Sequence, residues 1–278
     1  MVRRSRPSLA VSNIAWEPGE NDAVAAVLRE GGVGGVEIAP TKWRERPLDA
    51  TGEEVAAYRR EWEDRGLRIV SLQSLFFGQP ELQLFGDDAS RTAMSEYLLR
   101  MIDLGAALGA HVLVFGSPKN RIRGSLPLAS AMDVAAEFLR GVGAQAHACG
   151  SAVCIEANPI EYGCDFATTT AHAVELCRAA DHPGVRVNGD LGGMTMSGED
   201  SARSIENAGA LLAHFHASEP ALAAFGAGAD HARAAGGLAS VGYDGWISIE
   251  MRAAGGTGNV AAVERAVALA KARYSLAR

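Results

Sequence analysis

The stretch Val153-Cys154-Ile155-Glu156-Ala157-Asn158-Pro159 decides the interpretation of the whole chain. Its first three residues form an apolar, β-type run that is long enough for a buried strand. The Asn-Pro pair at its end stops regular structure. Glu156 lies between the two, and a buried carboxylate is costly unless it is paired or binds a metal. At the carboxyl end of a parallel strand it would instead face an active site, so the stretch predicts a strand that ends in a functional carboxylate.

Three later apolar runs end in the same way. They are 186–190, 212–216 and 246–250, so the four predicted strands end in Glu156, Asp190, His216 and Glu250. Taken singly, such residues are more often helix caps, rim charges or histidines bonded to the backbone. Four ligand types at the ends of four consecutive strands predict one metal site instead. Carboxylates with an imidazole suit one divalent ion such as Mn²⁺, Mg²⁺, Co²⁺ or Zn²⁺ better than copper.

Strand and helix patterns alternate eight times along the chain. Strands are expected at 9–14, 35–38, 67–73 and 111–115 before the Val153 strand, each followed by a helical pattern. Such alternation implies a parallel sheet covered by helices. Eight units favour a closed barrel with its active site at the carboxyl ends of the strands. We therefore predict an α/β protein, a single (β/α)₈ TIM barrel over residues 1–278.

An open doubly wound sheet is the competing architecture. Such a sheet normally has a glycine-rich phosphate-binding turn after its first strand. The corresponding turn here is Ala15-Trp16-Glu17-Pro18-Gly19, which lacks that pattern. No long linker or charged block marks a second domain, and the barrel remains the prediction.

Composition narrows the classes of partner. The 278 residues carry a net charge of −7, which argues against nucleic acid as a main partner. No apolar run is long enough to cross a membrane, and the segment around Arg3, Arg4 and Arg6 lacks the apolar core of a signal peptide. The four cysteines have no CxxC spacing and are expected to be reduced and mostly buried. A cytoplasmic enzyme with a small-molecule substrate is therefore expected.

The seventh predicted strand contains two histidines, His214 and His216. Because they are two residues apart on a strand, they share one face. The later one lies nearer the carboxyl end, so His216 is the expected metal ligand. His214 is expected below it, where it would support the site or fill a layer of the barrel.

At this point the sequence resembles a known family. The motifs that carry the likeness are 155–159, 188–192, 214–220 and 248–251. They are similar to those of the xylose-isomerase-like TIM barrels, in particular the sugar phosphate isomerase/epimerase group that includes the tagatose and psicose 3-epimerases. The resemblance covers nearly the whole chain, and its ligand pattern is more specific for the superfamily than for a substrate.

The resemblance implies one divalent metal ion held by Glu156, Asp190, His216 and Glu250. In the epimerases the two glutamates also exchange protons with a substrate carbon next to a carbonyl, which makes Glu156 and Glu250 the expected catalytic residues. A metal that polarises the carbonyl and two carboxylates that act as acid and base are consistent with that chemistry. The expected activity is that of a metal-dependent isomerase or epimerase on a small sugar or keto-polyol.

The sequence departs from the 3-epimerases at three places. The histidine that follows their metal-binding aspartate by three residues is replaced by Gly193, and the arginine six residues after the metal-binding histidine is replaced by Leu222. The glutamate shortly after the fifth strand corresponds to Glu161 only if one residue is deleted. These changes leave the barrel and the metal site in place, but they remove the basis for a ketohexose specificity.

Further residues are candidates for binding the substrate. Glu37 and Gln73 end the second and third strands and could bond sugar hydroxyls, or could hold the rim of the barrel. Asn158 follows the fifth strand, and Lys119, after the fourth, could bind a substrate oxygen or be a solvated charge. Aromatic side chains that could line a sugar pocket, or belong to the core, are Trp16, Phe76 and Phe77.

Other functions share parts of this pattern. A lyase or dehydratase acting on a keto-sugar or keto-cyclitol would use the same metal and the same first proton transfer. A hydrolase of the endonuclease IV type would need several extra histidine ligands, which a chain with 7 His does not supply at the predicted strand ends. A barrel that only binds sugar would be expected to have lost a ligand. The sequence leaves open the exact substrate, its phosphorylation, the metal and whether the chain forms a homo-oligomer.

Overall fold

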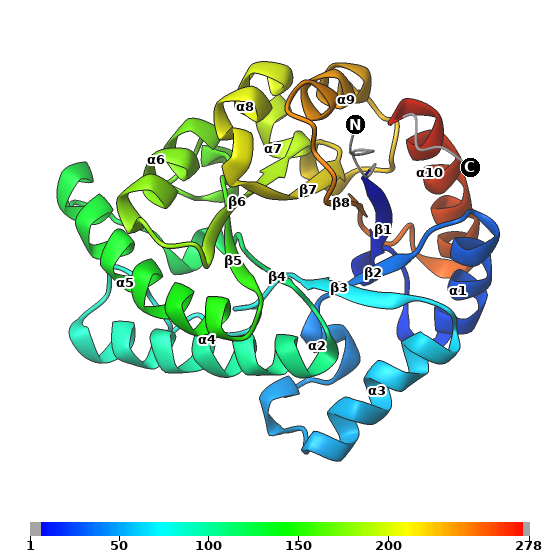
Figure 1. Ribbon diagram of the computed structural model, residues 1–278, viewed down its shortest axis with the longest axis horizontal. Helices are drawn as coiled ribbons and strands as arrows, with labels where there is room; N and C mark the ends of the chain where they lie inside the picture. Colours follow the sequence, from blue (N-terminus) through cyan, green and yellow to red (C-terminus); the bar gives the residue numbers. More distant parts are fainter. Residues whose placement is uncertain (1–6, 275–278) are drawn as a thin grey trace, which may run out of the picture.

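The strands of the protein close into a barrel in the order of the sequence, β1 to β8, with β1 paired to β8. The computed structural model describes residues 7–274, except for the side chain of Thr257. Every neighbouring pair of strands is parallel. Helices surround the strands, with α1, α3 and α10 on one side and α4, α5 and α6 on the other (Figure 1). The predicted (β/α)₈ barrel is confirmed, while Arg3, Arg4 and Arg6 lie outside the described residues.

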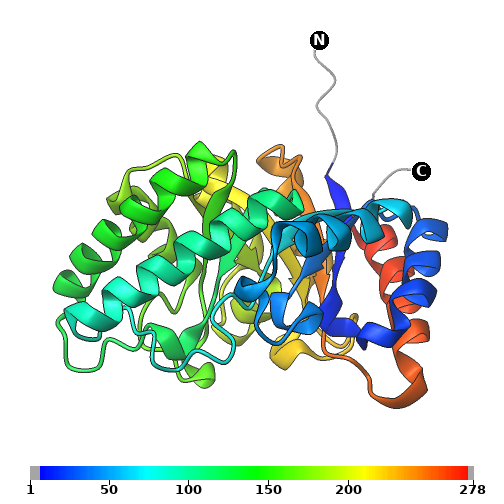
Figure 2. The ribbon, with the colours of Figure 1, turned by 90° about the horizontal axis from the view of Figure 1, so that it is seen from below.

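The elements have the following bounds. The strands are β1 (Ser8–Ser12), β2 (Gly35–Ile38), β3 (Arg68–Leu72), β4 (Val112–Phe115), β5 (Ala152–Glu156), β6 (Val185–Asp190), β7 (Leu212–Ser218) and β8 (Trp246–Glu250). The helices around them are α1 (Asn21–Glu30), α3 (Gly52–Asp64), α4 (Asp88–Leu108), α5 (Leu128–Ala148), α6 (Thr170–Ala180), α8 (Ser201–Ala208), α9 (His231–Ser240) and α10 (Asn259–Arg273). Short helices α2 (Pro40–Trp43) and α7 (Leu191–Met196) follow β2 and β6. Figure 2 shows the long helices α4 and α5, in teal and green, along the outside of the barrel.

The first and seventh strands end at different residues from those predicted. The first strand was expected to reach residue 14 but ends at Ser12, because residues 13–15 form a 3-10 turn that the Ser12 hydroxyl caps by accepting a hydrogen bond from the Ile14 amide. The seventh continues past His216 to Ser218, where it pairs with Glu250 of β8. Residues near the carboxyl ends of β7 and β8 are thereby brought side by side.

Side-chain alternation along the strands divides the core into two parts. Leu113 and Phe115 belong to the large layer between strands and helices. Val112 and Val114 point to the opposite face and form a separate small cluster with Cys154 inside the barrel. The inside of the barrel is therefore apolar at this level, and its polar groups lie closer to the carboxyl ends of the strands.

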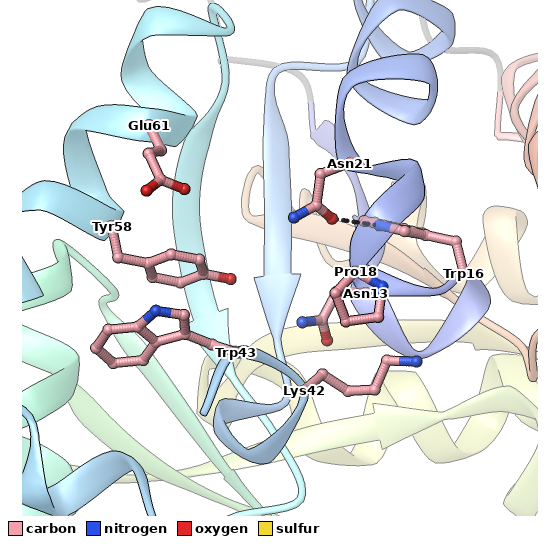
Figure 3. Close-up of a pocket in the computed structure, with 8 residues that line it drawn as sticks. All are labelled: Asn13, Trp16, Pro18, Asn21, Lys42, Trp43, Tyr58 and Glu61. Carbon is pink, nitrogen blue, oxygen red and sulfur yellow. Dashed lines mark hydrogen bonds between the residues drawn. The ribbon is translucent and has the colours of Figure 1, made fainter. Parts of the chain in front are cut away.

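Aromatic side chains pack the loop after β1 and helix α2 against α3. Trp16 and Tyr58 both lie edge-on to Trp62, at ring distances of 6.4 Å, and Trp43 stacks on Tyr58 at 4.5 Å. Figure 3 shows Trp16, Trp43 and Tyr58 around a small cavity of about 190 Å³, with Asn21 accepting a 2.8 Å hydrogen bond from the Trp16 indole. The cluster holds α2 in place next to the mouth of the barrel.

Helix α7 was not predicted, because its sequence contains Gly192 and Gly193 and glycine disfavours helices. The Asp190 side chain accepts a hydrogen bond from the Gly193 amide and caps the helix. A Cβ at Gly192 would lie 2.6 Å from the carbonyl oxygen of Glu219. Close packing against the loop after β7 therefore requires a glycine there, and this tertiary contact outweighs the local propensity.

Within the described part of the chain, no helix has the length and apolar character needed to span a membrane. The four cysteines are all free thiols, and three of them are buried, as expected.

A close contact between a glycine and α5 offers a test of the packing. A Cβ at Gly184 would lie 1.9 Å from the carbonyl oxygen of Gly143. We expect Gly184→Ala to lower the free energy of unfolding by roughly 1–3 kcal/mol, the usual scale of overpacking. Gly141, in the same helix, has nothing within 4 Å of a Cβ, so Gly141→Ala should stabilise by about 0.5–1 kcal/mol. Urea unfolding of both variants makes the comparison, and equal stabilities would contradict the packing described here.

Candidate metal centre

Four side chains converge at the carboxyl ends of β5 to β8. The Nδ1 atom of His216 lies 3.1 Å from Glu156 Oε2, 3.2 Å from Glu250 Oε2 and 3.9 Å from Asp190 Oδ2. These are the four residues that the sequence pattern predicted as ligands. Consecutive parallel strands bring their ends to one place, which is why residues about 30 positions apart in the chain meet here.

The cluster opens toward the barrel mouth. His216 has an exposed side-chain fraction of 0%, whereas Glu156, Asp190 and Glu250 expose 13%, 13% and 10%. The imidazole therefore forms the floor, and each carboxylate keeps an accessible edge. A small molecule can reach the carboxylates without reaching the histidine.

Two amides fix the orientation of Glu156. Asn158 Nδ2 donates to Oε1 at 2.9 Å, and Asn188 Nδ2 donates to Oε2 at 2.7 Å. Burial alone would raise the pKa of Glu156, but the close approach and charge of His216, with the Asn158 hydrogen bond, outweigh it and lower the pKa. Asn188 was not among the predicted residues, although its position two residues before Asp190 places both on the same face of β6.

Burial and like charges destabilise the ionised forms of the other two carboxylates. Burial, followed by the charges of Glu156 and Glu250, raises the pKa of Asp190 to about 7. Burial is also the main cause that raises the pKa of Glu250, and the charge of Glu156 adds to it. For Asp190, the charge of His216 and the hydrogen bond donated by Ser218 Oγ partly oppose this effect. The carboxylates are thus held close together against their mutual repulsion.

The cluster fits a divalent cation. His216 Nδ1 is buried and has no hydrogen-bond partner, although three carboxylates surround it. Within residues 7–274, no Lys or Arg forms an ion pair with any of these carboxylates. A cation would accept the imidazole lone pair and offset the carboxylate repulsion. One nitrogen with several carboxylate oxygens matches the ligand preferences of Mn²⁺, Mg²⁺, Co²⁺ and Zn²⁺.

Glu37 lies below the cluster and not at the mouth, where a substrate contact was expected. Its side chain is fully buried and accepts hydrogen bonds from the Ser71 and Ser248 hydroxyls, both at 2.8 Å. His214 Nε2 and His216 Nε2 each lie 3.1 Å from its carboxylate. A substrate cannot reach Glu37, because the barrel interior encloses it on every side.

The Glu37–His216 contact sets which imidazole nitrogen faces the carboxylate cluster. With Nε2–H donating to Glu37, the Nδ1 lone pair is free to bind a metal. Burial would raise the pKa of Glu37, but the charges of His216 and His214 and their hydrogen bonds hold it well below its usual range.

Glu37, His214 and His216 are also close enough together to form a second candidate metal group. Both oxygens of Glu37 already accept hydrogen bonds from serine hydroxyls. The group is therefore better suited to orient His216 than to hold an ion.

The other expected substrate contacts occupy different surroundings. Gln73 is buried and its amide donates to the Ser12 hydroxyl. Lys119 is exposed on the loop after β4, and its carbonyl accepts a 3.0 Å hydrogen bond from Gln83. Asn158 uses its amide nitrogen on Glu156. Among the three, Asn158 alone touches a residue of the metal centre.

Arg121 was missed by the sequence analysis because nothing in the chain distinguishes it from a surface arginine. It is 1% exposed, and its Nη2 donates to the Glu156 carbonyl and to Asn158 Oδ1, both at 2.6 Å. Its Nε and Nη1 atoms are buried without a partner. Arg121 therefore fixes the turn that carries Glu156 and Asn158.

The structure explains one departure from the epimerase pattern. A Cβ at Gly193 would lie 2.9 Å from Asp190 Oδ1, so a larger residue would disturb that carboxylate.

Leu222 has a left-handed backbone with a φ of 55°, and its carbonyl accepts a 3.0 Å hydrogen bond from the Arg252 amide. Leu222 lines the large cavity at the barrel mouth, at the position where the 3-epimerase pattern has an arginine.

A large cavity occupies the barrel mouth on the side of β1 to β3. Its volume is about 780 Å³, and it is lined from the loops after β1, β2, β3 and β7, including Ile14, Ala39, Ser74 and Leu222. The smaller cavity of Figure 3 lies beyond α2, and Lys42 lines both of them.

The fold and site together define the class of protein: a TIM barrel with an Asp-Glu-His cluster at the carboxyl ends of its later strands. Within this class, the chain belongs to the xylose isomerase-like TIM barrel family, whose model matches residues 25–273. The comparison with curated proteins finds no match.

Solved structures of similar proteins share the fold over nearly the whole chain. A D-psicose 3-epimerase crystallised in the presence of D-fructose has a TM-score of 0.79 at 18% identity, covering 97% of this chain and 100% of its own. An L-ribulose 3-epimerase has a TM-score of 0.78 at 17% identity, covering 97% and 95%. The 3-keto-D-glucoside 4-epimerase from E. coli has a TM-score of 0.76 at 17% identity, covering 96% and 100%. At these identities the likeness establishes the fold.

Replacing the only nitrogen donor of the cluster tests metal binding. We expect His216→Ala to contain markedly less metal than the parent protein after purification in Mn²⁺, because a carboxylate cluster without the imidazole offers a weaker site. Elemental analysis of the protein measures the content. His147→Ala, an exposed histidine on α5, is the matched control. Equal metal in His216→Ala and His147→Ala would show that the ion binds elsewhere.

The role of Glu37 can be separated from that of a ligand. Glu37→Gln preserves the size of the side chain but removes the charge that holds the His216 Nε2–H. Loss of such a partner typically lowers metal affinity about 10–100-fold. Competition with a fluorescent chelator would measure the change in metal affinity. Glu53→Gln, at an exposed position of α3, is the control and should leave the affinity unchanged. An unchanged affinity in Glu37→Gln would mean that the carboxylate does not orient the imidazole.

Proposed function

We propose that the protein is a divalent-metal-dependent isomerase or epimerase that moves a proton next to the carbonyl of a keto-sugar. The observation that carries the proposal is the convergence of Glu156 and Glu250, from β5 and β8, on the same imidazole nitrogen with Asp190 beside them. One Mn²⁺, Mg²⁺, Co²⁺ or Zn²⁺ ion would be held by Asp190, His216 and the two glutamates. We also propose a cytoplasmic setting.

The chain supplies two carboxylates that can exchange protons with one carbon. When bound, the cation would polarise the substrate carbonyl and make the neighbouring C–H more acidic. Glu156 and Glu250 approach the site from strands separated by β6 and β7, so they can reach different faces of a substrate placed between them. One carboxylate removes the proton and the other returns one, as positioned general bases and acids do.

The two glutamates have different surroundings. Both oxygens of Glu156 accept amide hydrogen bonds, from Asn158 and Asn188. Glu250 is approached within ion-pair distance by His216 only, among the described residues. Glu156 is thus held in one orientation by two amides, whereas no amide donates to the Glu250 carboxylate among the described residues.

The similar structures support a keto-sugar as the substrate. The three proteins named above are described as epimerases of D-psicose, L-ribulose and a 3-keto-D-glucoside. Each of those names places a carbonyl near an epimerised carbon, which is the chemistry that two carboxylates around a cation can perform. A lyase would share the first proton transfer and differ in losing water afterwards.

Solvent exchange tests the proposal. With Mn²⁺ bound, a keto-sugar incubated in deuterated water should take up deuterium at the carbon next to the carbonyl, detected by NMR, and EDTA should stop the uptake. Glu156→Gln and Glu250→Gln should each keep appreciable metal but lose about 10²-fold or more in rate. Glu175→Gln, at an exposed glutamate on α6, is the control and should retain activity.

The outcome also distinguishes the alternatives. Deuterium uptake with an epimerised or isomerised product supports the proposal, whereas a dehydrated product would identify a lyase. If both Gln variants bind metal and exchange protons at the parental rate, the two-carboxylate mechanism is wrong.

A further inference from the structure

The cavity at the barrel mouth borders the segment that follows Glu250. Two residues after Glu250, the Arg252 amide donates to the Leu222 carbonyl at 3.0 Å, and the next amide, of Ala253, donates to the Ile14 carbonyl at 3.0 Å. Leu222 and Ile14 both line the cavity. The segment after Glu250 therefore lies beside the cavity, and a group attached to a substrate held at Glu250 would have this space next to it.

The cavity is larger than one sugar ring requires. Its volume is about 780 Å³, within the range of about 300–1,000 Å³ of pockets that enclose drug-sized ligands. A free keto-sugar at the metal centre would leave most of this space filled only with water. The size indicates a substrate with a second part.

The surface of the cavity includes an exposed aromatic ring held by a rigid turn. Phe77 is 69% exposed, whereas the two preceding residues, Leu75 and Phe76, are 1% and 2% exposed. The Phe77 amide donates to the Ser74 carbonyl at 3.0 Å, and Ser74 has a left-handed backbone with a φ of 53°. Because its neighbours are anchored in the core, the backbone that carries the ring is held in place, and the ring offers apolar surface to the cavity.

The loops after β1 and β7 add apolar side chains to the lining. Ile14 and Leu222 lie among the lining residues, and Leu222 stands where the 3-epimerases carry an arginine. An arginine there would offer hydrogen bonds to sugar hydroxyls, whereas leucine offers only apolar surface. The wall therefore favours a ligand group without polar edges.

The charges around the cavity disfavour a phosphate. Its lining includes two cations, Lys42 and Arg46, and each already pairs with an acid: Lys42 with Glu17 at 3.1 Å and Arg46 with Asp49 at 2.8 Å. The remaining charged side chain of the lining is Glu45. A phosphate would meet an acid and two cations that each already have an acidic partner, so a neutral ligand fits better.

We propose that the substrate is a neutral keto-sugar glycoside with a flat apolar aglycone, such as an aryl group. This inference rests on the proposed function of the metal centre. The sugar occupies the carboxylate cluster, and the aglycone lies between Phe77 and the wall formed by Ile14 and Leu222. Stacking on Phe77 and burial of the aglycone stabilise the bound state, as aromatic contacts do in other binding sites.

The experiment compares two probes on the Mn²⁺-loaded enzyme: 3-keto-D-glucose and phenyl 3-keto-β-D-glucoside. We expect kcat/KM for deuterium uptake to be at least about tenfold higher for the phenyl glycoside, the scale of burying one aromatic group. Phe77→Ala and Leu222→Arg should each lower the ratio of the two kcat/KM values about tenfold. Leu269→Ala, an apolar residue exposed on α10, is the control and should leave the ratio unchanged.

Equal kcat/KM values for the two probes, or ratios that Phe77→Ala and Leu222→Arg do not change, would overturn the inference. A higher kcat/KM for 3-keto-D-glucose 6-phosphate than for the phenyl glycoside would also overturn it.

Binding separates this inference from the proposed function. If neither probe takes up deuterium, the proposed function fails. Calorimetry with phenyl β-D-glucoside and D-glucose then decides the apolar site: tighter binding of the phenyl compound that Phe77→Ala weakens supports it, and the absence of such a preference overturns it.

Discussion

The buried contact between Glu37 and His216 is the interaction on which the site depends. It lies in the interior of the barrel, where the carboxylate accepts hydrogen bonds from Ser71 and Ser248 as well as lying against the imidazole. An anion in such a place is costly unless its oxygens are satisfied, and here they are. Since one imidazole nitrogen is engaged with Glu37, the other must face the carboxylates above. The polar layer inside the barrel thus sets the orientation of the ligand at its mouth.

The carboxylates above this layer are fixed by the loops as much as by the strands. Asp190 ends β6 and also caps α7, so the same side chain borders the metal centre and starts a helix. Arg121 and Asn158 hold the turn after β5 in a similar way. Such support keeps like charges close together before any ion binds, which is the preorganisation that a metal site requires. The same arrangement requires a glycine at position 193, because a side chain there would press on the Asp190 carboxylate.

The mouth of the barrel has two sides with different chemistry. The side of β5 to β8 carries the ionisable groups and is suited to proton transfer. The side of β1 to β3 carries Phe77 and Ile14 and is suited to binding apolar surface. TIM barrels commonly vary their loops in this way while keeping the strand ends that perform the chemistry. In this protein, α2 and its aromatic cluster hold the second side in place (Figure 3).

The sequence by itself determined the barrel and the four residues of the cluster. A sequence with eight alternating strand and helix patterns is compatible with few folds other than the barrel. Once the sheet closes, the carboxyl ends of its strands meet at one mouth, and four of them carry Glu156, Asp190, His216 and Glu250. Only the tertiary structure decided what surrounds them. From the sequence, Glu37 was expected at the rim of the barrel, near the carboxyl end of β2. In the structure its side chain is fully buried inside the barrel, beneath His216. Arg121 and helix α7 depend on contacts between loops distant in sequence, and neither hydrophobic periodicity nor local propensity encodes such contacts. The exposure of Phe77 likewise follows from a turn whose other residues are anchored in the core.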